Sequence, residues 1–349
     1  MRVVAVSGTD PGHLIPVVAV AVALRARGHD VSVVTGGDWR ADVEASDLAF
    51  LELPRLEPDE GDADLGWRLW GRAEQMAGPL ATLLRDTHAE AVVTDTLVGS
   101  AGFAAELAGI PWVDVVPHFL WEPSRHLPPV GLGQRPARSV VGRLLERQQR
   151  RMQAASFAEG SEHRTRVRAA LGLTGLGGPV LRLVATLPGL EPPRPDWPRR
   201  TFLVGALEWD PPGWTELPLP DGGGPLVVVT DSTAGNVQTS VARAAVAGLA
   251  GEQVRTSDGR RGVAAEDVRL VVTSGSVEVD EPGVVVGQGP HGPLLDAAAC
   301  AVGSAGHGFV TKALVRGVPL VLVPLHGDQR ETAARVARAG AGVTVPPDA

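Results

Sequence analysis

Short apolar runs that end in turn-rich loops and continue into helical segments recur along this chain of 349 residues. Residues 3–6, 91–93 and 226–229 are runs of this kind. Continuous apolar runs this short are typical of strands that are buried on both faces of a parallel sheet. Strand and helix patterns alternate throughout the chain, so we predict an α/β fold built from parallel sheets.

A proline-dense segment at 187–198 interrupts this alternation. Proline cannot continue a long helix or a central strand, so the segment reads as a semi-rigid linker between two domains. The chain is long enough for two domains of ordinary size. We therefore expect an N-terminal domain over residues 1–190, a linker over 191–201 and a C-terminal domain over 202–349. The facing rims of the two sheets are expected to leave a cleft.

Composition excludes several classes of protein. The net charge of −8, with no basic block, argues against a nucleic-acid-binding protein. The single cysteine, Cys300, excludes a disulfide framework and fits a reducing compartment. The apolar start breaks at Gly8, too early for a signal peptide, and no run approaches the roughly 20 residues of a membrane span. We expect a cytoplasmic protein without a transmembrane segment, and leave peripheral membrane contact and oligomeric state open.

Two polar residues follow neighbouring apolar runs in the N-terminal half. His13 ends the turn-rich loop after the first run, and Asp95 ends the run that begins at Ala91. Because the carboxyl ends of parallel strands meet at one edge of a sheet, we expect the two side chains to converge. A carboxylate bonded to one imidazole nitrogen fixes the tautomer and leaves the other nitrogen free to act as a base. Simple helix capping by either residue is the alternative.

A glycine-rich turn spans residues 303–308, before a predicted helix. Glycine lets backbone N–H groups approach a ligand closely, and the following helix points its positive end at the same place. The turn therefore predicts a pyrophosphate site, with a ligand-free strand-to-helix turn as the alternative. Gly8 and Gly12 do not complete the G-x-G-x-x-G pattern, which disfavours a dinucleotide-dependent oxidoreductase.

Two segments are predicted to overhang the rim of the N-terminal sheet. The first, 53–76, is acidic and then carries Trp67 and Trp70, and the second begins with His118, Phe119 and Trp121. They are interpreted as walls of a pocket for a small-molecule acceptor, with plain surface packing as the alternative. The acidic residues near Trp67 are better explained as a solvated loop than as a metal motif, so no metal site is predicted.

Three motifs resemble the family 1 glycosyltransferases of the GT-B fold, particularly their bacterial natural-product branch. They are Gly12-His13-Leu14-Ile15-Pro16 with Arg27-Gly28-His29-Asp30-Val31, then Thr94-Asp95, and then Gly306-His307-Gly308 through Gly317-Val318-Pro319, Pro324 and Asp328-Gln329. The resemblance covers nearly the whole chain. It implies two Rossmann-like domains whose parallel sheets face a central cleft.

The resemblance also implies an activity in secondary metabolism. An inverting transferase of this kind moves a sugar from a UDP- or dTDP-sugar to a hydroxyl of a small, largely apolar natural-product or lipid-like acceptor, without a metal or a cofactor. His13 would deprotonate the acceptor and Asp95 would orient His13. The donor diphosphate would be bound by Ser232, Thr233, Ser304, Gly306, His307 and Gly308. The nucleoside would be bound by Gln288, His291 and Lys312, and the donor sugar by Asp328 and Gln329.

The departures from the family pattern fall in the donor site. Ser304 stands where the family has a histidine, Phe309 where it has threonine or serine, and Lys312 where a glutamate binds the ribose. Gln288 and His291 likewise replace a tryptophan and a glutamine. Loss of the histidine removes a charge-assisted hydrogen bond of about 1.5–3 kcal/mol. Lys312 either restores positive charge or is an ordinary exposed helix residue.

The C-terminal end is a second departure, because the sequence ends at Ala349 where family members continue with further helices. We therefore expect a C-terminal domain that is short at its end. The changed donor site leaves one alternative function open, a non-catalytic GT-B protein that binds nucleotide sugars or assists another transferase.

Overall fold

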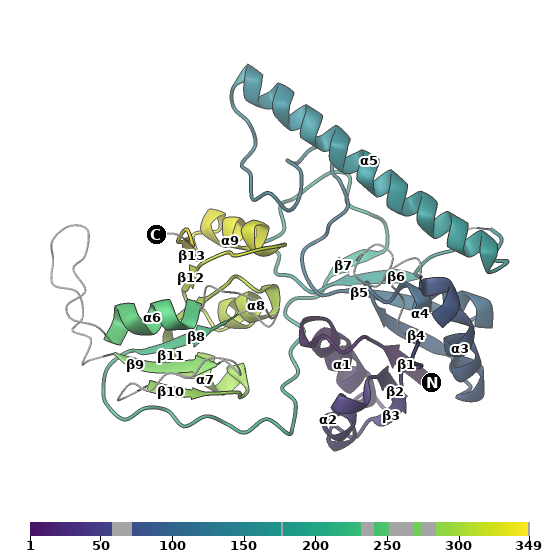
Figure 1. Ribbon diagram of the computed structural model, residues 1–349, viewed down its shortest axis with the longest axis horizontal. Coiled ribbons are helices and arrows are strands. Elements are labelled where there is room, and N and C mark those ends of the chain that lie inside the picture. The colour runs from purple at the N-terminus through teal and green to yellow at the C-terminus, as the bar shows by residue number, and fades with distance from the viewer. Residues whose placement is uncertain (58–71, 176, 232–240, 251–267, 274–283, 348–349) are drawn as a thin grey trace. The chain divides into compact units, whose positions relative to one another are not determined.

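The computed structural model describes residues 1–57, 72–175, 177–231, 241–250, 268–273 and 284–347. The chain divides into two compact units, each with its own sheet (Figure 1). The first unit comprises residues 1–130 and 135–211, and the second comprises 131–134 and 212–349. The predicted α/β class with two parallel sheets is confirmed. No helix in the described part of the chain is both long and apolar enough to cross a membrane.

The division between the units falls later than the expected domain boundary. Phe202 and Leu203, expected to open the C-terminal domain, lie in the strand Thr201–Leu203, which pairs with Leu181–Val184 in the first sheet. The chain passes to the second unit after Pro211, and residues 131–134 also belong to that unit. The prolines between residues 188 and 198 therefore lie within the first unit, where the buried Leu190 and Arg194 pack.

The first unit contains a parallel sheet. Its elements are β1 (Arg2–Val6), α1 (Pro11–Arg25), β2 (Asp30–Thr35), η1 (Gly37–Trp39), α2 (Arg40–Ala45), β3 (Ala49–Glu52), α3 (Ala73–Asp86), β4 (Ala91–Asp95), α4 (Gly99–Ala108), β5 (Trp112–Val116), α5 (Val140–Ala170), β6 (Leu181–Val184) and β7 (Thr201–Leu203). Among the described residues the sheet has seven strands in the order β3-β2-β1-β4-β5-β6-β7. Every pairing between these described strands is parallel.

The alternation of side chains along β1 explains why its residues are all apolar. Val3 and Ala5 pack with α1 in one core cluster, whereas Val4 and Val6 pack with α3 and α4 in another. Successive strand residues point to opposite faces, and helices cover both faces of this strand. A polar residue on either face of β1 would therefore be buried, which accounts for the continuous apolar run.

The strand order reverses between β1 and β4, because β2 and β3 lie on one side of β1 while β4 to β7 lie on the other. Open α/β sheets bind ligands at such a switch point, beyond the carboxyl ends of the strands. His13 follows β1 and Asp95 ends β4, so both predicted residues lie at the switch point of the first sheet.

The second unit repeats this plan. Its elements are β8 (Leu226–Thr230), α6 (Val241–Ala250), β9 (Arg269–Thr273), β10 (Val284–Gly287), α7 (His291–Ala297), β11 (Ala298–Gly303), α8 (His307–Val315), β12 (Leu320–Leu322), α9 (Gln329–Arg338) and β13 (Gly342–Thr344). The described strands form a six-stranded parallel sheet in the order β10-β9-β8-β11-β12-β13. Val227 and Val229 of β8 pack against Val241, Ala242 and Val246 of α6.

The second sheet has its own switch point, between β8 and β11. The glycine-rich turn predicted to bind a pyrophosphate follows β11 directly, and Gly303 pairs in register with Thr230 at the end of β8. The topology therefore places this turn where an α/β sheet of this kind binds a ligand.

Candidate active site

His13 and Asp95 are joined by a hydrogen bond in the first unit. His13 Nδ1 lies 2.8 Å from Asp95 Oδ1. Asp95 has 2% of its side-chain surface exposed, whereas His13 has 20%. Because a carboxylate only accepts hydrogen bonds, Nδ1 carries the hydrogen in this contact. The Nε2 atom is then the acceptor nitrogen of the ring, which is the arrangement that a general base needs.

The loop that carries His13 is held at several points. Asp10 caps α1 by accepting a hydrogen bond from the N–H of Gly12 at 2.8 Å, and Pro11 occupies the first helical position. Thr35 Oγ1 donates to the carbonyl of Gly8 at 2.9 Å, and Trp39 Nε1 donates to the carbonyl of Thr9 at 3.0 Å. The capping role is thus taken by Asp10, which leaves the His13 side chain for Asp95.

The predicted acceptor residues after β5 lie beside this pair. The His118 and His13 rings meet edge to face, with their centroids 6.3 Å apart. His118 also contacts Trp121 at 6.0 Å, and its Nδ1 lies 2.7 Å from the carbonyl oxygen of Phe119. Phe119 itself is fully buried, so it supports its neighbours rather than presenting a surface to a ligand.

A second buried carboxylate close to Asp95 was not foreseen from the sequence. Asp114 of β5 is 4% exposed, and Arg182 Nε of the neighbouring β6 donates to its Oδ2 at 2.7 Å. Burial raises the pKa of Asp114, while the charge of Arg182 and its hydrogen bond lower it. A hydrogen bond to Thr96 also lowers the pKa, and the charge of Asp95 raises it. Asp114 therefore supports the loop that begins at Asp95.

The glycine-rich turn in the second unit has a strained backbone. Ala305 is fully buried and has a φ of 65°, a left-handed conformation that costs a residue with a Cβ about 1 kcal/mol. Gly306 caps α8, and in the described part of the chain no atom outside their own neighbouring residues lies within 4 Å of the point where a Cβ of Gly306 or Gly308 would stand. Strain that persists next to an open helix N-terminus is typical of a ligand-binding turn.

The side chains on this turn and on α8 are enclosed. Ser304 is 2% exposed, His307 is 6% exposed and Lys312 is 5% exposed. The reading of Lys312 as an ordinary exposed helix lysine is therefore wrong. Phe309 is also buried, and its ring packs edge to face against His291 at 5.1 Å.

Two residues after β10 are predicted to bind the nucleoside, and they differ in their surroundings. His291 Nε2 lies 3.0 Å from Thr273 Oγ1, at the end of β9. Gln288 is exposed at the end of β10. His291 is thus engaged with the protein through one nitrogen, whereas Gln288 faces solvent.

Asp328 and Gln329 stand at the start of α9. The Asp328 side chain makes no capping hydrogen bond to this helix, and it is only partly buried. The Gln329 side-chain oxygen accepts hydrogen bonds from the N–H groups of Leu325 and His326, at 2.8 and 3.2 Å. Gln329 therefore orders the loop before α9 through its side-chain oxygen.

Four predicted site residues fall outside the described residues. They are Trp67, Trp70, Ser232 and Thr233, together with the acidic loop around Asp62. Within the described residues, no group of three or more histidine, cysteine, aspartate or glutamate side chains is arranged to hold a metal ion.

Comparison with known proteins gives matches along the whole chain. Residues 296–348 match the family described as UDP-glucoronosyl and UDP-glucosyl transferase. A 4'-demethylrebeccamycin synthase from Lentzea aerocolonigenes is 32% identical, over 98% of this chain and 87% of its own length. An O-mycaminosyltylonolide 6-deoxyallosyltransferase from Streptomyces fradiae is 28% identical, over 97% of this chain and 84% of its own length.

Solved structures show the same fold. The glycosyltransferase SsfS6 of Streptomyces sp. SF2575, complexed with thymidine diphosphate, superposes with a TM-score of 0.63 at 21% identity, covering 99% of this chain and 87% of that one. The synthase from Lentzea shares about a third of its aligned residues across nearly the whole chain. The chain therefore belongs to the family 1 glycosyltransferases of the GT-B fold, in their bacterial natural-product branch.

Proposed function

We propose that this protein transfers a sugar from a UDP- or dTDP-sugar to a hydroxyl of a small, largely apolar natural-product acceptor, with inversion at the anomeric carbon. The observation that carries the proposal is the hydrogen bond between His13 and the buried Asp95 at the switch point of the first sheet. The printed names of two relatives, a rebeccamycin-type synthase and a tylonolide glycosyltransferase, support the acceptor class. The thymidine diphosphate in SsfS6 supports the donor class.

In this reaction His13 Nε2 accepts the proton of the acceptor hydroxyl as its oxygen forms a bond to the anomeric carbon. The bond from that carbon to the diphosphate breaks at the same time, on the opposite face, so a single displacement inverts the configuration. Asp95 stabilises the imidazolium that forms and keeps the ring in the required tautomer. The edge-to-face contact of the His118 ring with the His13 ring supports the assignment of His118 to the acceptor side of the base.

The reaction also requires that the negative charge on the leaving diphosphate be stabilised. The N-terminus of α8 and the backbone N–H groups around Gly306 and Gly308 supply positive potential without a metal ion. Ser304 and His307 lie on this turn and Lys312 lies further along α8. Ser232 and Thr233, which follow β8 in the sequence, are proposed to add hydroxyl donors. Asp328 is proposed to accept hydrogen bonds from the donor sugar, while Gln329 holds the loop that presents it.

The test is an assay of transfer and donor hydrolysis across a panel of UDP- and dTDP-sugars, with 7-hydroxycoumarin as acceptor and a chelator present throughout. We expect His13→Ala to reduce kcat by about 10²–10⁴-fold, the usual contribution of a general base, while calorimetry shows unchanged nucleotide affinity. His163→Ala, which alters an exposed histidine on α5, is the matched control. Equal rates for His13→Ala and the parent protein would overturn the assignment of the base. Loss of transfer on adding the chelator would overturn metal independence.

The altered donor residues favour one alternative, a non-catalytic protein that binds nucleotide sugars or assists another transferase. Ser304 offers a hydroxyl where the family pattern has an imidazole, and Phe309 removes a hydroxyl. The same assay separates the two proposals. Nucleotide binding without transfer or hydrolysis from any donor in the panel would favour the binding protein.

A further inference from the structure

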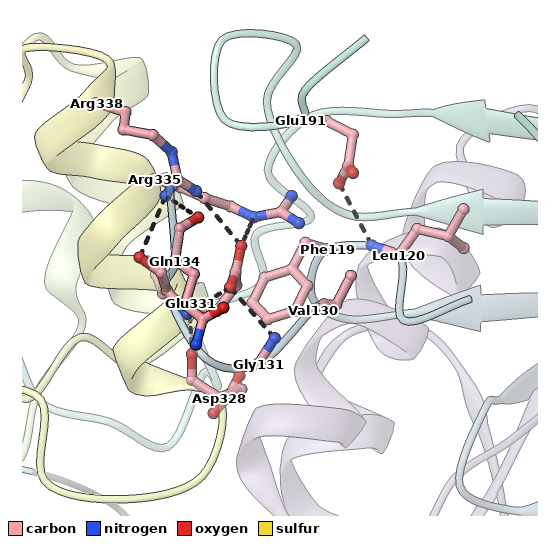
Figure 2. Close-up of polar contacts among 12 residues, drawn as sticks. Phe119, Leu120, Val130, Gly131, Gln134, Glu191, Asp328, Glu331, Arg335 and Arg338 are labelled. Atoms are coloured by element: carbon pink, nitrogen blue, oxygen red, sulfur yellow. Dashed lines mark hydrogen bonds and ion pairs between the residues drawn. The ribbon is translucent and has the colours of Figure 1, made fainter. Parts of the chain in front are cut away.

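A four-residue stretch of the loop between β5 and α5 belongs to the second unit. This loop starts in the first unit, where His118 contacts the His13 ring, and its residues Gly131–Gln134 group with the second unit. Figure 2 shows this stretch lying along α9, with Glu331, Arg335 and Arg338 around it. One loop thus carries the proposed acceptor residues at its start and a docking segment further on.

Glu331 is the centre of the contact. Its Oε2 accepts hydrogen bonds from the N–H groups of Gly131 and Gly133, at 3.2 and 2.8 Å (Figure 2). Its Oε1 accepts from Arg335 Nε at 2.9 Å and from Arg338 Nη2 at 3.4 Å. Each carboxylate oxygen thus faces two N–H donors. An amide in this place could satisfy only one of the two pairs, because its nitrogen is a donor.

Arg338 also contacts the backbone of residues 131–134. Its Nη1 lies 3.4 Å from the carbonyl oxygens of both Gly133 and Gln134. Glu331 and Arg335 are 5% and 3% exposed, so the ion pair between them is shielded from water. The N–H groups of the segment are therefore bound by the buried Glu331, and its carbonyl groups by the partly exposed Arg338. We call Glu331, Arg335, Arg338 and residues 131–134 the clasp.

Gly133 fits the clasp for two independent reasons. Its φ is +64°, in the left-handed region that favours glycine. A Cβ at this position would also stand 2.7 Å from the carbonyl oxygen of Arg330 and 3.0 Å from Ala334 Cβ. Only a residue without a side chain allows the segment to approach α9 this closely. The sequence Gly131-Leu132-Gly133 is therefore suited to this contact rather than to a general turn.

We propose that Glu331 is a positioning residue, which fixes the acceptor loop through the clasp so that acceptor affinity depends on helix α9. This proposal rests on the proposed function, because it takes His118 and its neighbours as the acceptor wall. Glu331 lies in the first turn of α9, the helix that Asp328 and Gln329 begin. The helix that presents the proposed sugar-binding residues thereby also holds the loop that binds the acceptor.

The clasp is tested first by limited proteolysis, which needs no activity. Trypsin cuts after arginine, and the Arg138–Ser139 bond follows the clasp closely. We expect Glu331→Gln and Gly133→Ala to speed cleavage at this bond by about tenfold, the effect of losing hydrogen bonds to a charged group. Gly340→Ala is the matched control, since Gly340 has a φ of +69° and no described residue beyond its chain neighbours has an atom within 4 Å of its Cβ position. Gly340→Ala introduces the same left-handed backbone strain as Gly133→Ala but no clash. Trypsin should therefore cleave its Arg138–Ser139 bond at the parent rate.

The positioning role is tested by separating the two substrates. We expect Glu331→Gln to raise the KM for 7-hydroxycoumarin about tenfold, while calorimetric affinity for UDP or dTDP changes less than twofold. Equal losses for acceptor and nucleotide would show that Glu331 only supports the fold of the second unit, and would overturn the proposal. Unchanged cleavage in both clasp variants would overturn it as well. Failure of the proposed function would instead appear as absence of transfer in the parent protein. The proteolysis result would then still show whether the clasp holds residues 131–134.

Discussion

Asp114 shows how a charged residue can occupy the interior of a strand. It lies in register with Arg182 on the neighbouring strand, and their side chains form an ion pair. Arg182 also pairs with Glu122, and the charge of Asp114 reaches Arg164 of α5. Burial alone would favour the protonated acid, and the charge and hydrogen bond of Arg182 oppose that tendency.

Replacing Arg182 by methionine should destabilise the protein in a pH-dependent way. The change removes the two influences of Arg182 that lower the pKa of Asp114. Burial and the charge of Asp95, which raise the pKa, are then opposed by the hydrogen bond to Thr96. A carboxyl group with a raised pKa binds its proton more tightly in the folded state, so stability rises as pH falls. We expect a loss on the order of 3 kcal/mol in urea unfolding at pH 8, and a smaller loss at pH 5.

The control for this experiment is Arg25→Met, in the same unit. Arg25 pairs with Asp47, whose side chain is 81% exposed, so its loss should cost less than about 1 kcal/mol at either pH. A defect in Arg182→Met that is equally large at pH 8 and pH 5 would show that lost packing, and not the buried carboxyl group, is responsible.

Residues of this kind mark the limit of what the sequence predicts. His13 and Asp95 could be found because they end apolar runs, and parallel strands bring such ends together. Asp114 and Arg182 lie within strands, and their pairing depends on β5 and β6 being neighbours, which no local pattern reveals. Glu331 could not be found either, because its partners lie 200 and 198 positions away along the chain.

At the scale of elements, the contact between α4 and β5 depends on a glycine. Gly102 lies in the buried helix α4, and a Cβ there would stand 2.9 to 3.2 Å from three atoms of the Trp112 ring. Trp112 belongs to β5, the strand that also carries Asp114. The helix can therefore pack on the ring only because residue 102 has no side chain.

We expect Gly102→Ala to destabilise the protein by about 1–3 kcal/mol, because overpacking outweighs the gain in helix propensity. Gly160→Ala provides the comparison, since Gly160 lies within α5 and, among the residues that the structure describes, no atom beyond its chain neighbours and its own helix backbone lies within 4 Å of its Cβ position. It should stabilise the protein by about 0.5–1 kcal/mol. Chemical unfolding of both variants measures the difference, and a stabilising Gly102→Ala would contradict the packing described.

The strands themselves could largely be predicted from the sequence, whereas their pairing partners in the sheets could not. The runs at 3–6, 91–93 and 226–229 lie in β1, β4 and β8, as their continuous apolar character predicts. Phe202 and Leu203 are expected in the C-terminal domain because they follow the prolines, yet they lie in β7, which pairs with β6. Proline density indicates where a chain lacks regular structure, but it does not say which sheet the next strand joins.

At the scale of the whole molecule, each unit has its own hydrophobic core. The clusters around α1, α3 and α4 belong to the first unit, and the cluster around α6 belongs to the second. Seven of the eight tryptophans fall in the first unit, and only Trp214 falls in the second. Tryptophan fluorescence therefore reports almost entirely on the first unit, whereas far-ultraviolet circular dichroism reports on both.

This asymmetry makes the location of the donor site measurable. A ligand that binds only the folded protein stabilises it by RT ln(1 + [L]/Kd), about 2.7 kcal/mol at a hundredfold excess over Kd. If UDP or dTDP binds at the turn before α8, the second unit gains that stability and its melting temperature rises by several degrees. We expect calorimetry and circular dichroism to show this shift, while the transition seen by fluorescence stays in place. A nucleotide that shifted the fluorescence transition alone would place its site in the first unit, and the donor assignment of Ser304 to Gly308 would be wrong.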